Sequence, residues 1–170
     1  VGSTPDGVKW IANYDAKFKG LIPARQALAE SRNAVAGWIA GAVGMGKVIR
    51  TCQDLGFRTP LHPYISTALG ASEVRLLELA GAYRAMASGL RAEPHVIKRV
   101  EDGAGTLLYE APGADGALPQ ESLALIQEGL RGVVRLPGGT AHALSGRAFP
   151  IPVMGKTGTT NDFRDALFVG

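Results

Sequence analysis

The sequence lacks several features that would point to a particular environment or partner. It has one cysteine, Cys52, which cannot form a disulfide within the chain and has no zinc-type partner spacing. We expect it at a small, buried position in a helix. The net charge is only +3 and no run of five or more like charges occurs, which argues against a nucleic-acid partner. The longest apolar run, residues 34–46, is shorter than the roughly 20 residues that cross a bilayer.

Aromatic residues are scarce as well, at 6% of the chain, so a mainly aliphatic core is expected. Glycine is abundant instead, with 23 of 170 residues against a usual share of about 7%. This predicts many turns and close backbone contacts. The length suits one domain or a large piece of one. Because the chain begins at Val1 without methionine and ends at Gly170 within a strand-like apolar run, we expect a fragment of a larger protein.

The first part of the chain is expected to be helical. Pro23 suits the start of a helix over residues 24–30, and Ser31-Arg32-Asn33 then interrupts it as a helix junction. Residues 34–43 are apolar on every face, which predicts a buried helix. A shorter helix is expected over residues 47–55.

The second part mixes helices with strands. Ser72 is expected to cap a helix that ends at Gly89, and a further helix is expected over residues 121–134. The segments 96–100 and 106–109 flank a glycine-containing turn, which is a hairpin pattern. Two more strands are expected, one from Pro152 into Lys156 and one over residues 166–169.

The segment Lys156-Thr157-Gly158-Thr159-Thr160 is the richest in chemistry, because it combines a cation with three hydroxyls and a glycine that lets another chain approach closely. Such a segment can hold an anionic substrate. Lys-Thr-Gly alone describes any turn that enters a strand. The pattern gains weight because it continues through Asp162, Arg164 and Asp165 to Phe168-Val169-Gly170.

Together with Ser31-Arg32-Asn33, this segment resembles two of the three signature motifs of penicillin-binding transpeptidases and serine β-lactamases. The similarity runs along nearly the whole chain and is closest to class A, bifunctional penicillin-binding proteins. Leu167 and Ala12 depart from the family pattern, where tryptophan and proline are usual. The other matching segments are Asn13-Tyr14-Asp15, Leu69 to Val74 with the helix after it, and Gly139-Thr140-Ala141.

The resemblance implies an α+β, penicillin-binding transpeptidase fold: an antiparallel sheet flanked by helices, and a helical lobe that carries Ser31 to Asn33. Residues 1–170 would be part of one transpeptidase domain. The implied activity is D,D-transpeptidation, in which a serine ester cross-links D-Ala-D-Ala stem peptides of peptidoglycan and in which β-lactams are captured. No cofactor or metal is implied. The parent protein would act in the periplasm, anchored by a segment absent here, and would carry a glycan-polymerising domain upstream.

The family's roles carry over to six residues. Ser31 would relay a proton to the leaving amine, and Asn33 would hold the peptide backbone. Lys156 would supply a positive field. Thr157 and Thr159 would bind the substrate carboxylate, and the N–H of Thr159 would be an oxyanion-hole donor. Gly158 would let the strand lie close to the peptide. Arg32 has no necessary role in this scheme.

The third motif, Ser-x-x-Lys, does not occur in the sequence. The nearest matches, which start at Ser72 and Ser88, end in Arg75 and Arg91, and arginine stays protonated and cannot act as the base. Both serines are expected at helix ends instead. We expect the nucleophile upstream of Val1, so the chain alone should be inactive.

Other functions fit parts of the sequence. A carboxypeptidase or β-lactamase would use water as the acceptor, and a non-catalytic module would keep the anion site without the serine. Residues 41–47 match most of a phosphate-binding loop, but Val48 lacks the magnesium-binding hydroxyl and the preceding segment is helix-like. Asp162 and Asp165 suit a polar turn tied back by Arg164 better than a metal site. The histidines share no ligand spacing and are expected at the surface or at helix caps: His62, His95 and His142.

Overall fold

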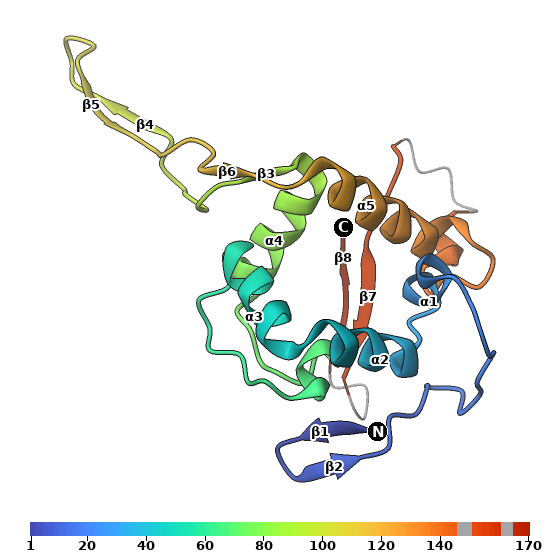
Figure 1. Ribbon diagram of the computed structural model, residues 1–170. Helices are drawn as coiled ribbons and strands as arrows, with labels where there is room; N and C mark the ends of the chain where they lie inside the picture. Colours follow the sequence, from blue (N-terminus) through green and yellow to red (C-terminus); the bar gives the residue numbers. More distant parts are fainter. Residues whose placement is uncertain (146–150, 161–164) are drawn as a thin grey trace.

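The computed structural model describes residues 1–145, 151–160 and 165–170 (Figure 1). These residues form helices and short antiparallel strands joined by loops. The α+β class is therefore confirmed. In chain order the elements are β1 (Gly2–Thr4), β2 (Gly7–Lys9), α1 (Ala24–Ala29), α2 (Asn33–Val43), α3 (Met45–Asp54), the 3-10 helix η1 (Ile65–Leu69), α4 (Leu76–Ser88), β3 (Leu90–Arg91), β4 (Arg99–Glu101), β5 (Leu107–Glu110), β6 (Gly116–Ala117), α5 (Gln120–Arg135), η2 (His142–Leu144), β7 (Lys156–Thr159) and β8 (Ala166–Val169).

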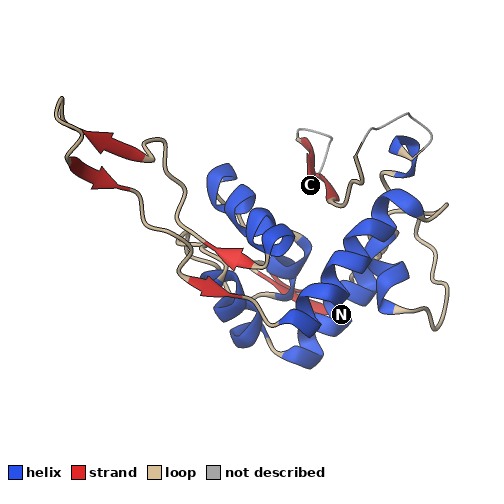
Figure 2. Cartoon of the chain, turned by 90° about the horizontal axis from the view of Figure 1, so that it is seen from above, coloured by secondary structure: helices blue, strands red, loops and turns tan. Residues whose placement is uncertain are grey.

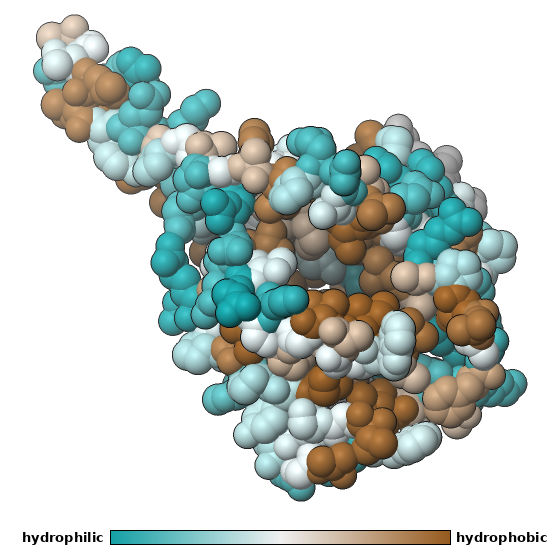
Figure 3. Space-filling view, in the orientation of Figure 1, coloured by the Kyte–Doolittle hydropathy of each residue, from teal (hydrophilic) through white to brown (hydrophobic). Residues whose placement is uncertain are grey.

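The strands form two-stranded antiparallel ladders: β1 with β2, β3 with β6, β4 with β5, and β7 with β8. The β4–β5 hairpin, which the sequence predicted, extends away from the helices in both views (Figures 1 and 2). Hydrophobic side chains gather at its outer part (Figure 3). None of the described helices is long and apolar enough to cross a membrane.

The packing of α1 on α5 positions the candidate site. Buried alanines of α1 lie against the apolar stripe of α5, and a Cβ at Gly129 would lie 2.7 Å from Leu28 Cδ2, so glycine is needed for this close approach. Two backbone hydrogen bonds then tie later segments to the pair: Thr140 N–H donates to Ala29 O (3.1 Å), and Gly155 N–H donates to Leu130 O (3.3 Å). The end of α1 and the start of β7 are thereby fixed to the same helix.

The prediction that residues 34–43 are buried on every face is wrong. Only one face of α2 packs, where Gly37 is so close to Ile11 that an added Cβ would lie 2.6 Å from its Cδ1. Trp38 is 73% exposed, and Ile39 and Val43 are exposed as well. Hydrophobic composition therefore did not determine burial in this helix.

Several element boundaries also differ from the predictions. α4 begins at Leu76 instead of Ser72, because the Ser72 hydroxyl pairs with the Thr67 hydroxyl (2.8 Å) and does not cap the helix. The segment before Lys156 is not a strand, because Val153 packs against the core around Val133. α3 begins at Met45 instead of Lys47, and β4 begins at Arg99 instead of Val96. The stop of α4 at Gly89 is confirmed, in a left-handed conformation (φ 76°), and α5 covers the expected residues.

Cys52 lies in a helix, α3, as predicted, but it is half-buried and not fully buried; this burial raises the pKa of the thiol. Residues 41–47 join two helices, so they form no phosphate-binding loop. His62 and His95 are exposed, and His142 Nδ1 meets Val134 O at the end of α5 (3.1 Å). The expected turn through Asp162 and Arg164 lies outside the described residues.

Candidate active site

Ser31 occupies a strained backbone position at the end of α1. Its N–H donates to Leu28 O (3.2 Å), and the N–H of Arg32 donates to Ala27 O (2.9 Å). These bonds form a Schellman motif, in which the residue at the position of Ser31 adopts a left-handed conformation and is usually glycine. Ser31 adopts it with φ 55°, at a cost of about 1–2 kcal/mol for a residue with a Cβ. A serine is therefore held where glycine would be easier.

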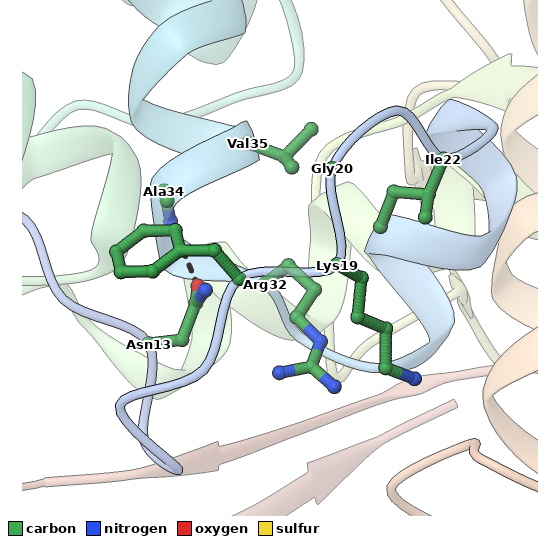
Figure 4. A pocket seen from close by; sticks show the side chains of 8 residues that line it. Asn13, Lys19, Gly20, Ile22, Arg32, Ala34 and Val35 are labelled. Atoms are coloured by element: carbon green, nitrogen blue, oxygen red, sulfur yellow. Dashed lines mark hydrogen bonds between the residues drawn. The ribbon is translucent and has the colours of Figure 1, made fainter.

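Asn13 fixes the start of α2, immediately after Ser31. It is 7% exposed, its Oδ1 accepts a hydrogen bond from the N–H of Ala34 (3.1 Å), and its Nδ2 donates to Lys17 O (2.7 Å) (Figure 4). The first turn of a helix has unpaired N–H groups, and Asn13 satisfies one of them. Asn33 Nδ2 donates to Ala12 O (3.3 Å), so two adjacent residues of this segment, Ala12 and Asn13, bind the first two residues of α2.

Lys156 joins the two motifs. Its Nζ donates to Ser31 Oγ (2.8 Å) and to Thr157 O (2.8 Å), across 125 positions of sequence in the first case. An ammonium has no lone pair, so Ser31 Oγ must accept, and the hydroxyl proton of Ser31 stays free to be donated. The lysine is half-buried, and burial lowers its pKa from the ordinary value of 10.5.

The threonines of β7 differ in their surroundings. Alternation along the strand places Thr157 and Thr159 on one face. Thr157 Oγ1 lies 2.6 Å from Thr140 Oγ1, whereas Thr159 is exposed. Apart from its two chain neighbours, none of the described residues has an atom within 4 Å of a Cβ built on Gly158. Thr160 lies beyond the strand, and its Oγ1 accepts from the N–H of Asp165 (2.8 Å) and donates to Asp165 Oδ2 (3.2 Å).

Sequence reasoning missed a charged cluster around Ser31. Arg32 Nη1 donates to both carboxylate oxygens of Asp15 (2.9 and 2.8 Å), and Arg32 Nε donates to Glu30 Oε2 (2.9 Å). Lys19 and Gln26 each donate a further hydrogen bond to Glu30, both at 2.8 Å. With Lys19 as the largest cause, these bonds lower the pKa of Glu30 to about 2. No periodicity or motif signals contacts between such scattered charges.

The cluster borders a cavity of about 150 Å³, lined in part by Phe18, Gly20 and Val35. The side chains of Arg32 and Lys19 extend in the same direction from this region (Figure 4). Thr140 is the other missed contributor, because it follows two glycines and reads as part of a turn. In residues 1–145, 151–160 and 165–170 no group of three or more His, Cys, Asp or Glu could hold a metal ion.

The arrangement combines a cation, a hydroxyl with a free proton and threonine hydroxyls on the same strand as the cation. It can bind an anion and deliver a proton to a neighbouring leaving group. Acyl transfer also needs a nucleophile. The Ser31 hydroxyl contacts the Lys156 ammonium and the Thr157 hydroxyl contacts Thr140, so neither is paired with a base.

Comparisons with known proteins agree with this geometry. The family model "Penicillin binding protein transpeptidase domain" matches residues 2–166. Penicillin-binding protein 1A of Aquifex aeolicus is 40% identical over 167 residues, and that of Neisseria gonorrhoeae is 35% identical over 178 residues; they cover 96% and 99% of this chain. The chain spans 22% of the length of each of these relatives.

Solved structures share the fold. The crystal structure of penicillin-binding protein 1A from Haemophilus influenzae superposes with a TM-score of 0.79 at 23% identity, over 99% of this chain and 31% of that one. The D,D-transpeptidase domain of a peptidoglycan glycosyltransferase from Eggerthella lenta gives 0.72 at 21% identity, over 92% and 46%. The two motifs are joined through Lys156 and Ser31, and the family model matches residues 2–166 of the 170 in this chain. The chain therefore belongs to the penicillin-binding protein transpeptidase domain family.

Proposed function

We propose that the chain supplies the carboxylate-binding and proton-relay part of a D,D-transpeptidase that cross-links peptidoglycan stem peptides and is captured by β-lactams. The observation that carries the proposal is the 2.8 Å hydrogen bond from Lys156 Nζ to Ser31 Oγ. It joins a cation to a proton donor, and the threonines that suit an anion lie on the same strand as the cation.

In the proposed reaction, a serine Oγ attacks the carbonyl carbon of the penultimate D-alanine. The peptide bond breaks, and an ester remains on the serine. Ser31 gives its proton to the leaving amine of the terminal D-alanine and receives in return the proton that a base in the parent protein takes from the attacking serine. The acceptor amine of a second stem peptide then attacks the ester carbonyl, its proton returns to the serine by the reverse relay, and the cross-link forms. Because the chain contains no Ser-x-x-Lys, we assign the nucleophile to another part of the parent protein.

The other groups act on binding and charge. Thr157 and Thr159 donate hydroxyl hydrogen bonds to the terminal carboxylate, and the positive charge of Lys156 favours the same anion. The N–H of Thr159 faces the developing oxyanion, a contact worth roughly 3 kcal/mol in comparable sites. Asn33 holds the peptide backbone. None of these roles uses a metal or cofactor.

The setting of the parent protein is part of the same proposal. Its relatives are about five times longer than this chain, which leaves room for the nucleophile region, a membrane anchor and a glycan-polymerising domain. We place the transpeptidase on the periplasmic side of the inner membrane, where peptidoglycan stem peptides are found.

The test is acylation of the full-length protein by a fluorescent penicillin. Lys156→Ala should lower the acylation rate by orders of magnitude, because it removes both the field and the contact to Ser31, and Lys156→Arg should restore only part of the rate. Lys47→Ala, which removes an exposed lysine of α3, is the matched control and should leave the rate unchanged. A wild-type rate in Lys156→Ala would refute the assignment.

A further inference from the structure

We infer that Arg32 is a positioning residue for the proposed acyl transfer: it holds Ser31 in its left-handed conformation and so keeps Ser31 Oγ on Lys156 Nζ. The inference rests on the proposed function, since it concerns how the relay serine of that reaction is held. The Arg32 side chain forms hydrogen bonds to Glu30 and Asp15 and none to Lys156 or to the threonines of β7. Its effect on those residues would therefore pass through Ser31.

The backbone at Ser31 needs support from outside. A residue with a Cβ at φ 55° is strained, and such conformations persist when the surrounding structure over-determines them. The two hydrogen bonds of the Schellman motif provide part of this support. They form equally well around glycine, so they do not explain how serine is kept there.

Arg32 provides the additional support through the residues on either side of Ser31. In a continuing helix, residues two apart do not face each other. Glu30 and Arg32 are two apart, yet Arg32 Nε lies 2.9 Å from Glu30 Oε2. The ion pair therefore closes across the turn at Ser31, and a return of Ser31 to a right-handed conformation would separate the two side chains.

The second half of the contact fixes the turn to the rest of the site. Arg32 Nη1 binds both carboxylate oxygens of Asp15, which belongs to the segment that also carries Asn13. Asn13 in turn holds the first turn of α2 through Ala34. The Arg32 guanidinium therefore connects the end of α1 to the loop that anchors α2, with Ser31 between them.

The Arg32–Glu30 pair at the centre of this cluster is largely shielded from solvent, whereas Asp15 and Lys19 at its edge are 38% and 43% exposed. The side chains of Arg32 and Glu30 are 12% and 7% exposed, whereas exposed pairs contribute little. Lys19 Nζ also donates to Glu30 Oε2, and Gln26 Nε2 donates to Glu30 Oε1, so the Glu30 carboxylate is held by two residues besides Arg32. Removing Arg32 would leave Glu30 bound to Lys19 and Gln26, but it would break the link across the turn at Ser31 and the link to Asp15.

The experiment separates positioning from simple stabilisation by measuring two quantities on the full-length protein. Penicillin acylation in stopped flow gives the noncovalent dissociation constant and the acylation rate constant. For Arg32→Met we expect the acylation rate constant to fall about 10- to 100-fold, as for a misplaced catalytic group, with the dissociation constant changed less than about twofold. Arg32→Lys should recover part of the rate, because it restores the charge but not the fork.

Arg58→Met is the matched control. It removes an exposed arginine whose partner, Glu93, lies outside the site, and both constants should match the wild type. Asp15→Asn keeps the shape of the side chain and removes one of the two charges that hold Arg32. It should lower the acylation rate constant several-fold, and it decides the question if Arg32→Met does not fold.

Each outcome has a defined meaning. If the wild type is acylated and Arg32→Met or a folded Asp15→Asn reacts at the wild-type rate, the positioning role is wrong while the proposed function stands. If affinity and rate fall together with the melting temperature, and Arg32→Lys restores nothing, Arg32 is only structural and the inference is also wrong. If the wild type itself is not acylated, the proposed function fails first.

Discussion

Replacing Ser31 with glycine or alanine should separate stability from activity. Both changes remove the hydroxyl that Lys156 contacts, so the loss of that hydrogen bond cancels when the two variants are compared. They differ in the backbone, because the position has φ 55°. The alanine variant should carry the left-handed penalty of about 1–2 kcal/mol, whereas glycine avoids it.

The expected difference is smaller than that penalty, because glycine also makes the unfolded chain more flexible, by about 0.4–1 kcal/mol relative to alanine. The net result should be a Ser31→Gly variant that is about 0.5–1 kcal/mol more stable than Ser31→Ala. For a domain of this size that corresponds to a melting temperature higher by roughly 1–4 °C. Both variants should lose about 10²- to 10⁴-fold in acylation, the usual contribution of a proton-transfer group.

Thermal unfolding followed by circular dichroism, together with penicillin acylation of the full-length protein, measures both effects. A Ser31→Ala variant as stable as Ser31→Gly would refute the strain argument. Acylation at the wild-type rate in either variant would show that the hydroxyl of Ser31 is not the relay.

Three further predictions follow from the same contacts. Thr157→Val and Thr159→Val should each weaken capture of carboxylate-bearing β-lactams by about 1.5–3 kcal/mol, whereas Thr160→Val should mainly lower the melting temperature. If Thr160→Val were the most damaging of the three changes in acylation kinetics, the assumed strand register would be wrong. Thr140→Val should weaken the same capture, because Thr140 holds the Thr157 hydroxyl (2.6 Å), and Thr140→Ser should restore it; equal capture by all three proteins would exclude this role. The pKa of Glu30 is about 2 in the folded protein against an ordinary value of 4.5, so its contribution to stability is full above about pH 4.5 and is lost as the pH falls toward 2. The melting temperatures of the wild type and of Glu30→Gln should therefore converge between pH 4.5 and 2. A constant difference between them would contradict the assignment.

The local signals in the sequence predicted the elements that depend on local chemistry. The apolar stripe of α5, the stop at Gly89 and the β4–β5 hairpin all have short-range causes, and the structure contains each of them. The motif residues Ser31 and Lys156 were assigned to one site by resemblance, and Lys156 Nζ lies 2.8 Å from Ser31 Oγ.

The features that the sequence did not predict depend on contacts between distant segments. Whether α2 is covered depends on its neighbours and not on its composition, so the exposure of Trp38 was missed. The role of Arg32 depends on Asp15, which is 17 positions away, and on a turn that a serine does not normally adopt. A serine at a glycine position is a local inconsistency, and such inconsistencies are expected at functional sites.

The most direct test of the central claim is to locate the penicillin adduct by intact-mass analysis and peptide mapping. We predict one adduct per full-length protein, on a serine outside residues 1–170, and no adduct on the 170-residue chain alone. This follows from the proposal that the chain supplies the anion site and the proton relay but not the nucleophile. A stoichiometric adduct on any serine within residues 1–170, or a folded full-length protein that forms none, would contradict the account.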